Sequence, residues 1–177
     1  MATKPISVNR APVLTLWAAV VAERLGFDAD SALSLGKALA GLNAQTKGRS
    51  LGIFKPPALA AGEKPKKAGL GEQFWIELCG RPIPAKNTSD GVRAVVKDRP
   101  VEPGSVRKYL EGAFKSDLDA VRKAMRSLAS AFAPEDLADR AFGLYERFRP
   151  QVASGRGGWG QKGELSLERI RSLAKQA

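Results

Sequence analysis

Apolar residues in the first third of the chain predict two helices in succession. Residues 11–25 are almost wholly apolar, and this pattern predicts a helix that is buried on more than one side. A second helix is expected over residues 31–47, where apolar positions repeat at helical spacing. Its buried stripe comprises Ala32, Leu35, Leu39 and Leu42. Asp28 or Asp30 can cap the start of this helix, because a short acidic side chain accepts hydrogen bonds from the free amides there.

The pattern changes to strand-like alternation later in the chain. Residues 73–79 alternate between two faces, which predicts a strand. Residues 81–85 are expected to form a second extended piece at a sheet edge, because their prolines lack the N–H that a central strand needs. Thr88 or Ser89 is then expected to cap a short helix. The apolar residues of that helix are Val92, Val95 and Val96.

The C-terminal part of the chain is predicted to be helical. A 3.6-residue period runs through residues 106–132 and is expected to break near Lys115. Pro134 suits a first helical turn, so another helix is expected from there to Pro150. A last helix is expected after Ser166. These patterns together predict a mainly α fold of the α+β class, with an N-terminal helical pair and a helical module that carries a small strand element.

Composition along the chain predicts three segments. Residues 1–54 contain the helical pair. Residues 55–72 are rich in proline, glycine, alanine and lysine without a core pattern, which is typical of a basic linker. Residues 73–177 contain the strand element and the helical module. The three segments carry net charges of +3, +2 and +6, so the basic surplus is spread along the chain.

The overall charge favours a polyanionic partner. The net charge is +11 and the pI is about 10.1, and a surplus of this size favours nucleic acid. Residues 1–10 are expected to be a mobile arm, with Lys4 and Arg10 able to touch phosphates. The alternative is a solvated basic protein that has no polyanionic partner.

The residue inventory limits the chemistry. The chain has no histidine, which excludes His-containing zinc sites and Ser-His-Asp triads. Its one cysteine, Cys79, excludes an internal disulfide and fits a reducing cytoplasm. We therefore expect no enzymatic activity, no cofactor, no metal site and a cytoplasmic location. A signal peptide is the alternative for the start of the chain, because a basic stretch precedes the apolar residues 11–22.

A spacing pattern around the first turn suggests a nucleic-acid-binding unit. A small residue, Ala22, is followed four positions later by Gly26, and apolar residues flank the turn. These apolar positions are Val21, Leu25, Phe27, Ala32 and Leu35. Over residues 18–37 the chain resembles the helix-turn-helix superfamily, and this resemblance implies DNA binding by the second helix. A purely structural helical hairpin is the alternative.

The outer face of the second helix carries the first group of predicted contacts. Opposite the leucine stripe lie Ser34, Lys37, Gly41 and Ala44, a face of small residues with one cation. The predicted nucleic-acid contacts on and after this helix are Ser34, Lys37, Asn43, Gln45, Lys47 and Arg49. The cations would bind phosphates and the two amides would read base edges. The expected partner is duplex DNA in preference to RNA, and no membrane. The alternative is a protein–protein or RNA-associated adaptor, or a homodimer, that uses the small-residue face.

Two further segments supply candidate contacts. The linker contributes Lys64, Lys66 and Lys67. The glycine-rich residues 153–163 contain Arg156, Trp159 and Lys162. Backbone amides of such a loop can hold phosphate, and Trp159 can stack on a base. The alternative places Trp159 in the core. The resulting hypothesis is sequence-tolerant or regulatory DNA binding.

Overall fold

The computed structural model describes residues 6–46, 73–79, 81–89, 91–96, 99–150 and 162–176. The helices are α1 (Arg10–Arg24), α2 (Ala29–Thr46), α3 (Pro103–Phe114), α4 (Leu118–Ser130), α5 (Pro134–Phe148) and α6 (Leu167–Gln176), with a 3₁₀ turn, η1 (Lys115–Asp117), between α3 and α4. The strands are β1 (Ile6–Asn9), β2 (Gln73–Leu78), β3 (Arg81–Thr88), β4 (Gly91–Val96), β5 (Arg99–Pro100) and β6 (Lys162–Leu165). The described part of the chain is mostly helical with small antiparallel sheets, as the apolar pattern predicts.

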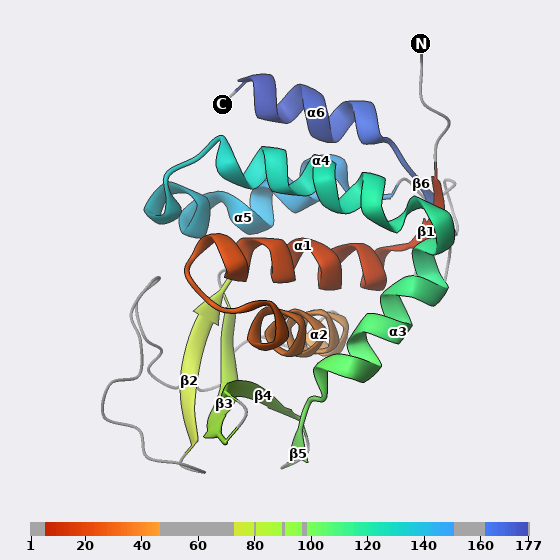
Figure 1. Cartoon of the computed structure of the whole chain (residues 1–177). Coiled ribbons are helices and arrows are strands. Elements are labelled where there is room, and N and C mark those ends of the chain that lie inside the picture. Colours follow the sequence, from red (N-terminus) through yellow and green to blue (C-terminus); the bar gives the residue numbers. More distant parts are fainter. Residues whose placement is uncertain are drawn as a thin grey trace.

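Helix α1 is the central element of the fold (Figure 1). Every side chain from residue 12 to residue 22 is buried, which confirms that this helix is covered on more than one side. α2 and the β2–β5 sheet lie on one side of it, and α4 and α5 lie on the other. Trp17 fixes α1 against α5, because its indole Nε1 donates to the Ala141 carbonyl oxygen at 2.8 Å and its ring meets the Phe148 ring edge-on at 5.2 Å.

The turn between α1 and α2 forms where the sequence predicts it. Gly26 adopts a φ of 114°, a conformation that costs glycine little. Asp28 caps α2, since its carboxylate oxygens accept from the Ser31 amide at 3.2 Å and from the Ser31 hydroxyl at 2.6 Å. The two helices then approach closely at Gly36, where an added Cβ would lie 2.5 Å from the Thr15 carbonyl oxygen.

The larger sheet differs from the sequence prediction in two places. Residues 91–96, predicted to be helical, form the strand β4. Valines that are three or four positions apart fit a helix, but β-branched side chains favour a strand, and β4 pairs with β3 on one side and β5 on the other. The predicted edge position is met only in part, because residues 81–84 pair with β2 alone whereas the rest of β3 lies between β2 and β4. Its prolines are tolerated because Pro82 and Pro84 pair with β2 alone, and the register with β4 begins at Ala85.

The predicted mobile arm is also wrong for the residues that the structure describes. Residues 6–9 form β1, which pairs antiparallel with β6 so that Ile6 lies opposite Leu165. Ile6 and Val8 are buried, and Arg10 is the first residue of α1. The Arg10 guanidinium Nε donates to the Pro150 carbonyl oxygen at 3.1 Å, which joins the start of α1 to the end of α5. Lys4 lies outside the described residues.

The C-terminal helices follow the prediction closely. The helical period breaks at Lys115, which has a φ of 53°, and Pro134 occupies the first turn of α5. Ser166 caps α6, because its hydroxyl accepts from the Arg169 amide at 3.3 Å. Residues from both predicted segments, 1–54 and 73–177, share one hydrophobic core, so the helical pair does not form a separate unit. The predicted linker at 55–72 lies outside the described residues. No helix in the described part of the chain is long and apolar enough to cross a membrane.

Candidate nucleic-acid interface

The small-residue face of α2 is covered by the protein itself. Ser34 is fully buried. Its hydroxyl donates to the Val101 carbonyl oxygen at 2.9 Å and accepts from the Ala94 amide at 2.8 Å. Ser34, which was predicted to contact nucleic acid, is therefore enclosed by the fold. Small side chains on this face do allow another surface to come close, and that surface is the edge of β4 together with the segment that enters α3.

The Lys37 side chain also contacts another part of the fold. Its ammonium lies 4.1 Å from the centroid of the Tyr109 ring on α3, in a cation–π geometry. Partial burial lowers the pKa of Lys37 below its ordinary value. This lysine therefore joins α2 to α3, and its ammonium faces the Tyr109 ring instead of projecting freely into solvent.

The other predicted contacts are only partly placed. Gly41 is exposed, and no atom lies within 4 Å of the position that a Cβ would take there. Asn43 and Gln45 belong to α2, and Lys162 belongs to β6, where it pairs with Asn9. The side chains of these three are not described. The remaining predicted contacts, all outside the described residues, are Lys47, Arg49, Lys64, Lys66, Lys67, Arg156 and Trp159.

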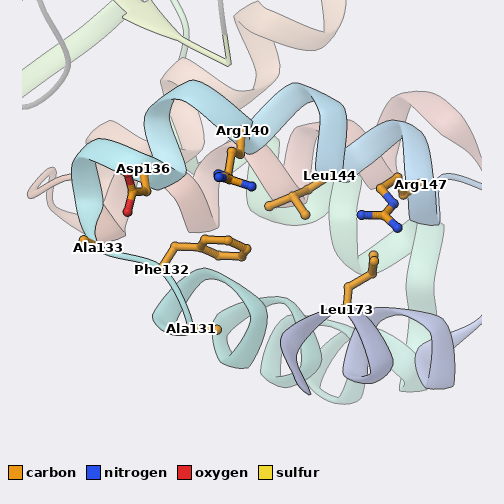
Figure 2. A pocket seen from close by; sticks show the side chains of 8 residues that line it. All are labelled: Ala131, Phe132, Ala133, Asp136, Arg140, Leu144, Arg147 and Leu173. Atoms are coloured by element: carbon orange, nitrogen blue, oxygen red, sulfur yellow. The ribbon is translucent and has the colours of Figure 1, made fainter. Parts of the chain in front are cut away.

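A groove that the sequence does not predict lies between α5, α6 and the turn that joins α4 to α5 (Figure 2). We call it the α5–α6 groove. Its volume is about 390 Å³, and it is lined by Ala131, Phe132, Ala133, Asp136, Arg140, Leu144, Arg147 and Leu173. Leu144 and Leu173 are buried and form an apolar floor, whereas the side chains of Arg140 and Arg147 are exposed.

Helix α5 supplies half of the lining of this groove because of its residue spacing. Asp136, Arg140, Leu144 and Arg147 are four, four and three positions apart, and residues at these separations share one face of a helix. Phe132 is held from the opposite side. The Arg24 guanidinium Nη2 donates to the Phe132 carbonyl oxygen at 2.9 Å, and the half-buried Phe132 ring packs against the core. The groove therefore has one fixed aromatic wall.

Arginine dominates the electrostatics of this groove. The Arg140 guanidinium carbon lies 5.9 Å from the centroid of the Phe132 ring. An adjoining hollow shares Arg147 and Leu173 and adds one carboxylate, Glu168, and one cation, Arg169. The Arg169 guanidinium Nη1 donates to the Arg147 carbonyl oxygen at 3.3 Å. Within the described part of the chain, no ion pair joins Arg140 or Arg147 to a carboxylate. Guanidinium groups stay charged at all ordinary pH values, so the groove presents permanent positive charge.

A second basic surface lies on the outer face of α4. A shallow hollow of about 520 Å³ is lined by Asp119, Arg122, Lys123, Arg126, Ser127 and Ser130. One of its cations is engaged, because the Arg126 guanidinium lies 3.6 Å from the Glu23 carboxylate. This surface has no aromatic ring and no apolar floor, so it offers charge without a place for a base.

Metal-ligating side chains do not gather anywhere in the described residues. No group of three or more His, Cys, Asp and Glu side chains in these residues could hold a metal ion. Cys79 is buried, and burial raises the pKa of its thiol to about 12, so the reactive thiolate is scarce at neutral pH.

Sequence reasoning missed the α5–α6 groove because its parts come from three places in the chain. The spacing of Arg140, Leu144 and Arg147 is visible in the sequence, but arginine near a helix end also suits the helix dipole. Phe132 and Leu173 come beside these residues only through the packing of α4, α5 and α6. Comparison of the chain with protein-family models, curated proteins and solved structures finds no match.

Proposed function

We propose that the protein binds nucleic acid, without catalysis, in the α5–α6 groove. One observation carries the proposal: exposed arginines border a groove that has an apolar floor and an aromatic wall. The cations suit phosphates, and an apolar floor beside an aromatic ring suits bases. A net charge of +11 supports an anionic polymer as the partner, because it attracts polyanions over a distance.

This proposal replaces the second helix of a helix-turn-helix as the contact surface. A recognition helix must enter the major groove of DNA with its side chains exposed. In α2 the side chains of residues 31–36 and 38–40 are buried. We therefore assign the packing of α1 on α2 a structural role, and place the nucleic-acid contacts on the opposite side of α1.

A protein–protein adaptor is the second candidate function. The observation that favours it is the buried floor of Leu144 and Leu173, which would hold an apolar side chain of an acidic peptide. Phosphate binding releases counterions and therefore depends steeply on salt, whereas apolar packing does not. A competing peptide of glutamate and leucine would separate the two functions.

The test compares double variants that each remove two positive charges. Arg140→Ala/Arg147→Ala empties the groove of its cations, and Arg99→Ala/Lys108→Ala removes two exposed cations from β5 and α3, at the other end of the molecule. Binding of fluorescent single-stranded DNA, duplex DNA and RNA is measured by anisotropy at several salt concentrations. For two lost phosphate contacts on a single strand, the logarithmic salt slope should fall by about 1.4 in the groove variant. The control variant should keep the slope of the wild type.

Three outcomes oppose the proposal. Equal losses in both double variants would mean that binding follows net charge and has no site in the groove. Normal binding by Arg140→Ala/Arg147→Ala, with loss in Arg122→Ala/Lys123→Ala, would move the interface to α4. Displacement of the nucleic acid only by the apolar acidic peptide would favour the adaptor function.

A further inference from the structure

We infer that the Phe132 ring and the Arg140 guanidinium form a slot for one unpaired nucleobase, so that the partner is single-stranded nucleic acid. This inference rests on the proposed function and adds the substrate class. Both groups line the same end of the α5–α6 groove, and Figure 2 shows the ring lying beneath the arginine. Aromatic rings and guanidinium planes are the two surfaces on which unstacked bases are held.

The Arg140 guanidinium and the Phe132 ring are separated by nearly the distance that a base between them would need. The guanidinium carbon lies 5.9 Å from the ring centroid. A flat base between them needs about 3.5 Å on each side, so the slot must open by roughly 1 Å. Arg140 is exposed and can make this movement by a side-chain adjustment. The Phe132 backbone carbonyl accepts the hydrogen bond from Arg24 and its half-buried ring packs against the core, so Phe132 is the more constrained of the two groups.

Unpaired bases are required because a duplex does not expose their faces. In duplex DNA each base is stacked between its neighbours, and a protein meets only base edges and phosphates. The Phe132–Arg140 slot contacts a face. A duplex can therefore touch Arg140 and Arg147 through its phosphates but cannot fill the slot.

Charges along α5 indicate where the base and the phosphates of the bound strand lie. Asp136 lies one turn before Arg140, and Arg147 lies about 10.5 Å beyond Arg140 along the helix axis. The Asp136 carboxylate repels phosphate and accepts hydrogen bonds from exocyclic amino groups, which cytosine has and thymine lacks. The base therefore lies at the Asp136 end, and phosphates extend toward Arg147 and Arg169. This arrangement predicts tighter binding of deoxycytidine strands than of thymidine strands.

The decisive variant is Phe132→Leu, which keeps an apolar side chain and removes the ring. The full-length protein is titrated with short deoxycytidine strands and with duplex DNA. Loss of one stacked base should weaken single-strand binding by about 5- to 150-fold, and duplex binding should stay unchanged. The salt slope should also stay unchanged, because no charge is removed. Phe132→Tyr should bind like the wild type, and melting temperatures identify any variant that is not folded.

The outcomes separate this inference from the proposed function. If the wild type binds neither single strands nor duplex, the proposed function fails. If it binds both and Phe132→Leu leaves single-strand binding intact, or weakens both equally, the slot is wrong while the function stands. Equal affinity for free deoxycytidine monophosphate would replace the strand by a mononucleotide. Asp136→Ala should abolish the preference for deoxycytidine over thymidine. An unaltered preference would contradict the placement of the base beside Asp136.

Discussion

The Ser34 hydroxyl on α2 accepts a hydrogen bond from the Ala94 amide on β4 at 2.8 Å, with both residues buried. The same hydroxyl donates to the Val101 carbonyl oxygen. A single side chain thus satisfies two backbone groups, one on β4 and one in the segment between β5 and α3. This relationship converts the presumed outer face of α2 into an internal contact.

Ser34→Ala should therefore destabilise the protein by about 1–3 kcal/mol, because it leaves the buried Ala94 amide without an acceptor. Urea unfolding followed by circular dichroism measures this change. Ser127→Ala, at an exposed position on α4, is the matched control and should alter the free energy of unfolding by no more than about 0.5 kcal/mol. Equal stabilities for the two variants would mean that α2 does not pack on the sheet as described.

Glycine positions on α2 give a second test of its packing. Gly36→Ala places a Cβ 2.5 Å from the Thr15 carbonyl oxygen, so the two helices must separate, at a cost of about 1–3 kcal/mol. Gly41→Ala meets no atom within 4 Å and should stabilise the helix by about 0.5–1 kcal/mol. Opposite signs in thermal or urea unfolding are expected. A tolerated Gly36→Ala would contradict the close approach of α1 and α2.

The lone cysteine reports whether the sheet is folded. Burial raises the pKa of the Cys79 thiol to about 12, and only the thiolate reacts with disulfide reagents. The folded protein at pH 8 should react far more slowly with Ellman's reagent than the protein in guanidinium chloride. Because the pKa is higher in the folded state, the contribution of the thiol to stability is present below the unfolded pKa and is lost as the pH rises toward 12. Rapid reaction of the folded protein would show that Cys79 is accessible.

The Asp28 carboxylate should make the stability of the protein depend on pH in the acidic range. Burial alone would raise the pKa of Asp28. Hydrogen bonds from Ser31 and from the Asp28 backbone, together with the charge of Arg93, lower this pKa below the ordinary value of 3.8. Its contribution to stability is therefore present above pH 3.8 and is lost as the pH falls through the folded pKa. Asp28→Asn keeps a good helix cap and removes the charge. The stability difference between wild type and Asp28→Asn should shrink below pH 3.8, and a constant difference would exclude the carboxylate as its source.

Local patterns predicted the helices well because those patterns are determined by neighbours in the sequence. The continuous apolar run of α1, the Asp28 cap and the Pro134 start each depend on residues within a few positions, and the structure confirms them. The prediction failed for residues 91–96 because the spacing of Val92, Val95 and Val96 fits a helix, whereas pairing with β3 and β5 makes the segment a strand.

The candidate site could not be predicted from the sequence in the same way. The face of α2 that contains Ser34 has the composition of an open surface, and a strand some sixty positions later covers it. Likewise, Phe132 and Leu173 line the same α5–α6 groove only because the α4–α5 turn and α6 both pack along α5. Both outcomes depend on contacts between distant segments, which residue spacing does not encode.

Ultraviolet cross-linking to a single deoxycytidine strand, followed by trypsin digestion and mass spectrometry, tests the central claim most directly. The chain offers separate tryptic peptides for the rival sites. Residues 127–140 contain Phe132, residues 25–37 contain the buried face of α2, and residues 157–162 contain Trp159. The groove account predicts that the cross-linked nucleotide is found on residues 127–140 and is lost in Phe132→Leu. A cross-link confined to residues 25–37 or 157–162, with none on residues 127–140, would contradict it.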